Sequence, residues 1–107
     1  MQTKYEEITT MEGKKAISFS VKTRKGDAHG VFCENRIWVH GIYGKGSVKG
    51  LMSTLIKHFG TNLVTFTPLI NDNVENSIKG EVRVCKAGDP QNPYGEDFKY
   101  LDCVWRC

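Results

Sequence analysis

Apolar and polar residues alternate with a period of two at 16–23, which is the pattern of a half-buried β-strand. It places Ile17, Phe19 and Val21 on one face of an extended segment. This alternation predicts a strand at 16–23, and two runs rich in β-forming residues predict further strands at 29–33 and 36–43. We therefore expect a hairpin-rich sheet to begin after Lys15.

The second and third of these strands should form a β-hairpin, because only Glu34 and Asn35 separate them. Asparagine tolerates the positive φ angle that a two-residue hairpin loop requires. Gly41 interrupts the third strand. A glycine inside a strand indicates a β-bulge or the close approach of another segment.

The strongest periodicity in the sequence predicts a helix from Ser47 to Phe59. Apolar residues recur there at spacings of three and one, which gives a single apolar helical face. They are Val48, Leu51, Met52, Leu55, Ile56 and Phe59. Ser47 is a favourable N-cap, and Gly60 suits the left-handed position just past the helix end.

The second half of the chain predicts further strands and a second, short helix. In order these are a strand at 63–67, a polar helix at 71–79, a strand at 81–85, a loop at 87–97 and a last strand at 98–105. In the last strand, Phe98, Tyr100 and Val104 should reach the core. The strands on either side of the long helix should be parallel neighbours. The fold class expected is therefore α+β: a mixed, mostly antiparallel sheet with a central parallel β-α-β unit and one or two helices.

Length and composition favour a single domain spanning residues 1–107, with 39% apolar and 25% charged residues. A membrane-spanning helix needs about 18 consecutive apolar residues. No such run occurs, so we expect no membrane partner. The N-terminus lacks the basic-then-apolar plan of a signal peptide, which favours a cytoplasmic protein. The net charge of +3 is spread along the chain, which permits an anionic ligand but does not favour nucleic acid.

The chain has four cysteines and no C-x-x-C motif. They are Cys33, Cys85, Cys103 and Cys107. Three lie in apolar, strand-like runs, where a free thiol behaves as a small hydrophobic side chain. Buried reduced thiols are the favoured interpretation, and a zinc site or a disulfide is the alternative.

The turn between the third strand and the long helix is the segment that could carry chemistry. It reads Tyr43-Gly44-Lys45-Gly46-Ser47-Val48. Main-chain N–H groups in a glycine-rich turn converge, and a helix N-terminus adds partial positive charge. Lys45 and Lys49 would add formal charge. The turn therefore predicts a phosphate or pyrophosphate site, and the alternative is a connector that binds nothing.

The order of elements around this turn resembles the GNAT superfamily of acetyl-CoA-dependent N-acetyltransferases. The matching order is the strand 36–43, the turn 44–46, the helix 47–59, the strand 63–67, a short helix and two closing strands. The family's loop pattern is Arg/Gln-x-x-Gly-x-Gly/Ala, and Gly46 matches its first glycine. The segment Gly50–Ile56 is similar to the family's helix. The resemblance covers Ala16 to Arg106.

This resemblance implies that loop amides hold the pyrophosphate of acetyl-CoA or coenzyme A, and that an acetyl group moves to an amine on a small molecule or protein. The cofactor-binding residues would be Ile42, Tyr43, Gly44, Lys45, Gly46, Ser47, Val48, Lys49 and Asn76. His40 stands where the family often has its general base, and imidazole exchanges protons near neutral pH. Tyr94 would donate a proton to the thiolate if the 87–97 loop folds over the site. A structural role for His40 is the alternative.

Departures from the family pattern keep a second function open. Tyr43 stands where the family has Arg or Gln, Val48 stands where it has Gly or Ala, and 73–80 lacks the family's tyrosine. The alternative is a non-catalytic interaction or inhibitor protein, for example of phage or mobile-element origin. Its contact surfaces would be an exposed Trp105, the basic tip 22–25 and the loop 88–97. Whether the chain is an enzyme stays open on sequence alone, as does its oligomeric state.

Overall fold

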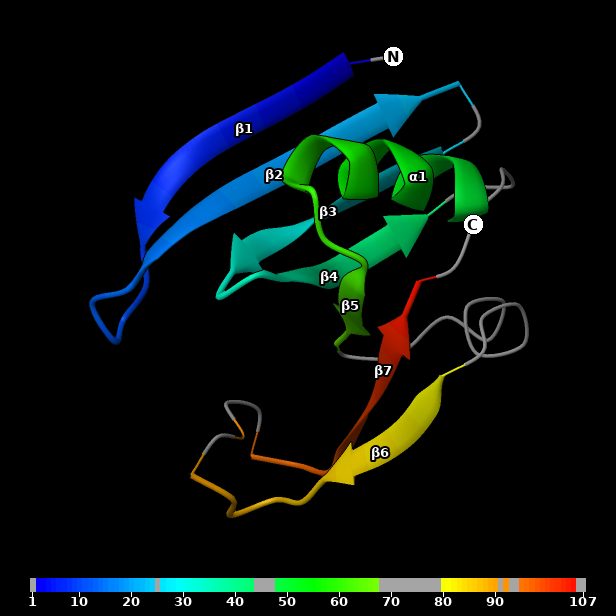
Figure 1. The fold of residues 1–107 in the computed structure, drawn as a ribbon. Coiled ribbons are helices and arrows are strands. Elements are labelled where there is room, and N and C mark those ends of the chain that lie inside the picture. The colour runs from blue at the N-terminus through cyan, green and yellow to red at the C-terminus, as the bar shows by residue number, and fades with distance from the viewer. Residues whose placement is uncertain are drawn as a thin grey trace.

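The computed structural model describes residues 2–24, 26–43, 48–67, 80–90, 92 and 95–105, without the side chains of Val48 and Lys49. These residues form one seven-stranded sheet of order β1-β2-β3-β4-β5-β7-β6 and one helix (Figure 1). The elements are β1 (Gln2–Thr9), β2 (Lys15–Thr23), β3 (Gly26–Cys33), β4 (Arg36–Tyr43), α1 (Val48–Phe59), β5 (Leu63–Phe66), β6 (Glu81–Cys85) and β7 (Phe98–Val104).

One pair of neighbouring strands is parallel, and the other pairs are antiparallel. The parallel pair is β4 and β5, which flank α1 in the chain. This confirms the parallel pairing predicted for the strands on either side of the long helix. The hairpin between β3 and β4 is also confirmed, since Glu34 and Asn35 have φ angles of 53° and 60°. Gly60 has a φ of 71° just past the helix, as its position predicted.

The hydrophobic core lies between α1 and one face of the sheet. Figure 1 shows the helix lying across β2, β3 and β4. Met52 and Leu55 supply its most deeply buried side chains, both 0% exposed. The strands contribute alternate residues from the same face, including Phe19, Val21, Ile37, Val39, Val64 and Phe66. Burial of this apolar area is the main favourable term in the folding of the domain.

The predicted α+β class with one or two helices is wrong. The described residues form a β-rich fold, with seven strands and one helix of 12 residues. The strand β1 was not predicted, because its residues do not alternate and seven of its eight positions are exposed. Its extended state comes from pairing with β2 along its full length. The helix predicted at 71–79 lies outside the described residues.

The last strand is shifted by one residue from its predicted orientation. Its buried residues are Leu101 and Cys103, followed by Trp105, which is 8% exposed. The predicted core residues Phe98, Tyr100 and Val104 belong to the opposite face, and Val104 is 53% exposed. A shift of one residue moves every side chain of a strand to the other face of the sheet. Trp105 is therefore a core residue and is not the exposed contact residue that the sequence suggested.

Among the residues that the structure describes, no helix combines the length and the apolar character needed to cross a membrane.

Candidate functional site

The pairing between the parallel strands β4 and β5 ends several residues before β4 does. Their pairing runs from Ile37 and Val64 to Val39 and Phe66, and the main-chain N–H of Thr67 then donates to the carbonyl of Val39 at 3.0 Å. Beyond this bond β4 continues to Tyr43 alongside β3, whereas β5 has ended. We call Val39–Tyr43 together with Phe66–Thr67 the fork.

A β-bulge places His40 within the fork. His29 pairs with Gly41 and Gly30 pairs with Val39, so His40 has no counterpart on β3. A Cβ atom on Gly41 would meet the ring of His29, an exposed side chain that would have to move to make room for it. Bulges change the direction of the neighbouring side chain and are common near functional sites. The interruption that Gly41 predicted is therefore confirmed, and the extra residue is His40.

The contact between His40 and Thr67 determines which ring nitrogen is free. The Nδ1 atom of His40 lies 3.1 Å from the carbonyl oxygen of Thr67. A carbonyl oxygen can only accept a hydrogen bond, so Nδ1 must carry the proton. In the neutral ring Nε2 then has a lone pair, and the side chain is exposed. His40 can therefore take a proton from a group that approaches the carboxyl end of β4.

The other described residues of the predicted site have separate roles. Ile42 is 7% exposed and belongs to the core, so its side chain is not available to a ligand. Tyr43 is 50% exposed, and its ring stacks on His29 with centroids 6.0 Å apart. Val48 and Lys49 begin α1, and their side chains are not among the described ones. The first turn of α1 contains no acidic residue, so its own charges would not repel an anion.

The remaining predicted residues lie outside the described part of the chain. They are Gly44, Lys45, Gly46, Ser47, Asn76 and Tyr94. The structure thus brings His40, Ile42 and Tyr43 together at the end of one strand, next to the start of α1. The convergence of loop amides on a phosphate stays a prediction.

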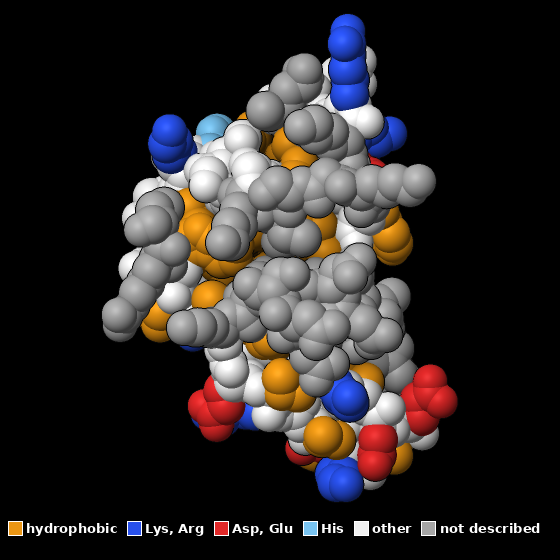
Figure 2. Space-filling view, turned by 90° about the vertical axis from the view of Figure 1, so that its right-hand side faces the viewer, with side chains coloured by type: hydrophobic (Ala, Val, Ile, Leu, Met, Phe, Trp, Pro, Cys, Tyr) orange, Lys and Arg blue, Asp and Glu red, His pale blue; other side chains and the backbone are white. Residues whose placement is uncertain are grey.

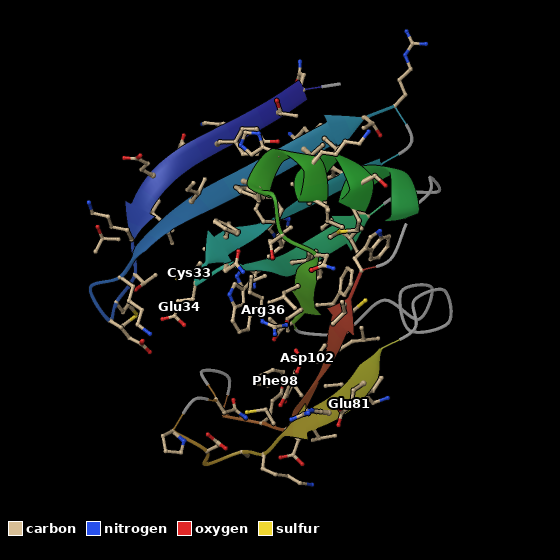
Figure 3. The ribbon with its side chains drawn as sticks, in the orientation of Figure 1. Cys33, Glu34, Arg36, Glu81, Phe98 and Asp102 are labelled. Carbon is tan, nitrogen blue, oxygen red and sulfur yellow. The ribbon has the colours of Figure 1, made fainter. Side chains whose placement is uncertain are left out.

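A second polar cluster joins β4, β5 and β7 on the sheet face opposite α1 (Figure 3). The hydroxyl of Thr65 donates to a carboxylate oxygen of Asp102 at 2.6 Å and accepts from the Arg36 guanidinium at 2.9 Å. Thr65 is only 1% exposed. Arg83 on β6 approaches the other oxygen of Asp102 at 3.9 Å, and Arg36 lies over the Trp38 ring at 6.0 Å.

This cluster was not predicted from the sequence, because its members are far apart in the chain. Knowing the register of β5 against β7 would have revealed the cluster, because that register places Thr65 directly opposite Asp102. The hydroxyl and the carboxylate oxygens already have partners within the protein, so the cluster is best suited to holding three strands together. A buried hydroxyl of this kind stabilises the fold only while both of its partners remain.

The cysteines in the described part of the chain are free thiols: Cys33, Cys85 and Cys103. Burial raises the pKa of the Cys103 thiol above its usual value, and desolvation also raises the pKa of Cys85. Both therefore favour the protonated form, which is a poor nucleophile. Cys103 fits the predicted buried thiol, whereas Cys33 and Cys85 are only partly buried. Among the described residues, no three His, Cys, Asp or Glu side chains are grouped as metal ligands.

A comparison with known proteins gives no relative: no family model, curated protein or solved structure matches this chain. The resemblance to N-acetyltransferases therefore stays a prediction from the order of elements and the loop sequence.

Proposed function

We propose that this protein binds coenzyme A or its acetyl thioester at the fork and transfers the acetyl group to an amine. The observation that carries the proposal is the position of His40, which lies on a bulge where the pairing of the one parallel strand pair of the described sheet ends. In open α/β sheets, ligands bind outside the carboxyl ends of parallel strands. By analogy, the fork lies at the carboxyl end of the parallel pair, where β4 leads into α1.

The charge around the fork supports an anionic cofactor. The chain enters α1 at Val48, and no acidic residue stands in the first turn of that helix. A helix N-terminus carries partial positive charge and unpaired N–H groups, which suit phosphate oxygens. The sequence adds Lys45 and Lys49 on either side of this point. A pyrophosphate at the start of α1 would follow directly, along the chain, the strand β4 that carries His40.

In the proposed reaction the amine nitrogen attacks the thioester carbonyl carbon, and the carbon–sulfur bond breaks. The nitrogen must lose a proton, and Nε2 of His40 is the atom that takes it. The bond from Nδ1 to the Thr67 carbonyl fixes the tautomer and the ring direction that this transfer needs. The departing thiolate must gain a proton, for which Tyr94 is the sequence-predicted donor.

The test begins with isothermal titration of the protein with coenzyme A and with acetyl-CoA. Acetyl transfer to a panel of amines is then followed by the release of free thiol. His40→Asn is the most informative variant, because its amide can still donate to the Thr67 carbonyl but lacks the Nε2 base. We expect cofactor binding to be retained and the transfer rate to fall roughly 10²- to 10⁴-fold.

His58→Ala is the matched control, since this exposed histidine lies in the last turn of α1 and stacks on Tyr5. The control should keep the full transfer rate. An unchanged rate in His40→Asn would remove His40 as the base. Absence of binding at millimolar coenzyme A would remove the proposed function as a whole and favour the non-catalytic interaction protein.

A further inference from the structure

The strand β6 is the edge of the described sheet at the end opposite β1, and β7 is its one neighbour there. Four of its five residues are exposed. These include Val82 and Val84, whose side chains are 41% and 49% exposed. Figure 2 shows apolar side chains mixed with charged ones at the lower end of the molecule, where β6 and β7 lie. An exposed edge strand with apolar side chains is a template for pairing with another strand.

The direction of the main-chain groups follows from the neighbouring pairing. Just past the end of β7, the N–H of Trp105 donates at 2.7 Å to the carbonyl of Asn62, the residue before β5, so the main chain at Trp105 faces the β5 side. In antiparallel pairs this direction alternates from residue to residue. The main-chain groups of Asp102 and Tyr100 therefore face β6.

Across this pair, Asp102 lies opposite Glu81 and Tyr100 lies opposite Arg83. The main-chain groups of Glu81 and Arg83 thus bond to β7, and those of Val82 and Val84 point away from the sheet. Within the described residues, this edge therefore offers the N–H and C=O groups of the same two residues whose side chains are exposed. This is the arrangement that an added strand requires.

The charges of β6 favour a second copy of the same strand. Glu81 and Arg83 project from the other face of β6 and form an ion pair at 2.9 Å. If two copies pair antiparallel about Val82, each Glu81 lies opposite the Arg83 of the other copy, and the two Val82 side chains meet. Opposite charges and β-branched pairs in directly facing positions stabilise sheets. Pairing about Arg83 would instead place two arginines opposite each other.

We propose that this protein forms a symmetric dimer through antiparallel pairing of β6 with β6 of a second copy, centred on Val82. The two sheets join into one continuous sheet across the two-fold axis. Both copies use the same surface, so the contact closes and does not grow further. The contact of one five-residue strand is small compared with a standard interface, which makes the dimer weak and dependent on concentration.

Sedimentation velocity over a wide concentration range tests the dimer in the full-length chain. We expect a reversible monomer–dimer equilibrium. Val82→Pro removes the outward N–H and leaves the bonds to β7 in place, so it should abolish the dimer. Val82→Thr is the matched control, because it keeps the N–H and the β-branched shape, and it should still dimerise.

Charge substitutions test the register. Glu81→Arg and Arg83→Glu each place like charges opposite each other, so each variant alone should raise the dissociation constant by about tenfold. An equal mixture of the two variants restores both opposite-charge pairs and should recover association. A chain that stays monomeric at all concentrations, or one that grows into open-ended assemblies, would overturn the proposal. If the mixture of the two variants did not associate, the register centred on Val82 would be overturned.

Discussion

The strands β2 and β6 have similar sequence patterns but different surroundings. Each alternates apolar and polar residues, and each was predicted as a strand from that alternation. In β2, Phe19 and Val21 are at most 2% exposed, because α1 and two neighbouring strands cover them. In β6, Val82 and Val84 are more than 40% exposed. Alternation therefore predicts the extended conformation, and the position in the sheet decides whether the apolar face is buried.

The largest expected difference between the two regions comes from truncating an apolar side chain in each. Leu55→Ala should lower the free energy of unfolding by about 2–5 kcal/mol, because Leu55 is fully buried between α1 and the sheet. Val84→Ala should change it by less than about 0.5 kcal/mol, since that side chain is already half exposed. Urea unfolding at low protein concentration measures both. If the two variants lost similar free energies of unfolding, the apolar face of β6 would be buried to the same degree as the core.

A second test compares two glycines, one in the sheet core and one in the helix. A Cβ atom on Gly30 would clash with the main-chain oxygen of Trp38 and lie 2.9 Å from the Phe19 ring. Gly30→Ala should therefore destabilise the protein by about 1–3 kcal/mol.

Gly50→Ala is the matched control, since nothing lies within 4 Å of the added atom. In a helix, alanine is more favourable than glycine by up to about 1 kcal/mol, so this variant should be more stable than the wild type. Thermal unfolding of both variants gives the comparison. A Gly30→Ala protein as stable as the wild type would contradict the close packing of β3 against β4.

The fold could be predicted wherever the pattern was local. The hairpin at Glu34-Asn35 and the helix ending before Gly60 were found from neighbouring residues alone. The strand β1 could not be found, because it is exposed and forms by pairing with β2. The orientation of β7 depends on which residues face α1, and alternation alone allowed either face for Tyr100 and Leu101.

In the candidate site too, local features could be predicted from the sequence, whereas contacts between distant residues could not. The bulge was predicted from Gly41, which stands out within a strand. The hydrogen bond from His40 to Thr67 could not be predicted, because it depends on the register of two parallel strands that are far apart in the sequence. The cluster of Arg36, Thr65 and Asp102 was missed for the same reason.

This cluster gives the third test, at the boundary between the core strands and the β6–β7 pair. Thr65→Val keeps the shape of the side chain but removes the hydroxyl that bonds both Arg36 and Asp102. We expect a loss of about 1–3 kcal/mol, because Arg36 and Asp102 each lose a charge-assisted hydrogen bond to this hydroxyl. Hydrogen exchange should show faster opening of β7 relative to β2. If protection from hydrogen exchange fell uniformly over the whole sheet, the cluster would not link these strands specifically.

The smallest expected effect lies in the loop that joins β6 to β7. The main-chain N–H of Ala87 donates to Asp97 at 2.7 Å. This bond, assisted by Lys86, lowers the pKa of the Asp97 carboxyl below its ordinary value of 3.8. A lowered pKa means that the carboxylate stabilises the loop at pH values above 3.8 and that this contribution is lost as the pH falls through the lower value.

The Ala87 amide signal in nuclear magnetic resonance spectra should therefore titrate below pH 3.8. Asp97→Asn keeps an oxygen acceptor but does not titrate, so its Ala87 signal should stay constant over the same range. A titration that persists in Asp97→Asn would assign the effect to another carboxyl group.

A titration with coenzyme A, followed by the amide signals of the isotope-labelled protein, tests directly whether the fork binds this cofactor. We expect saturable shifts at Val39, His40, Tyr43 and Thr67, where the pairing of β4 with β5 ends, and no change at Val82 and Val84. Shifts confined to β6, or none at millimolar coenzyme A, would contradict binding at the fork.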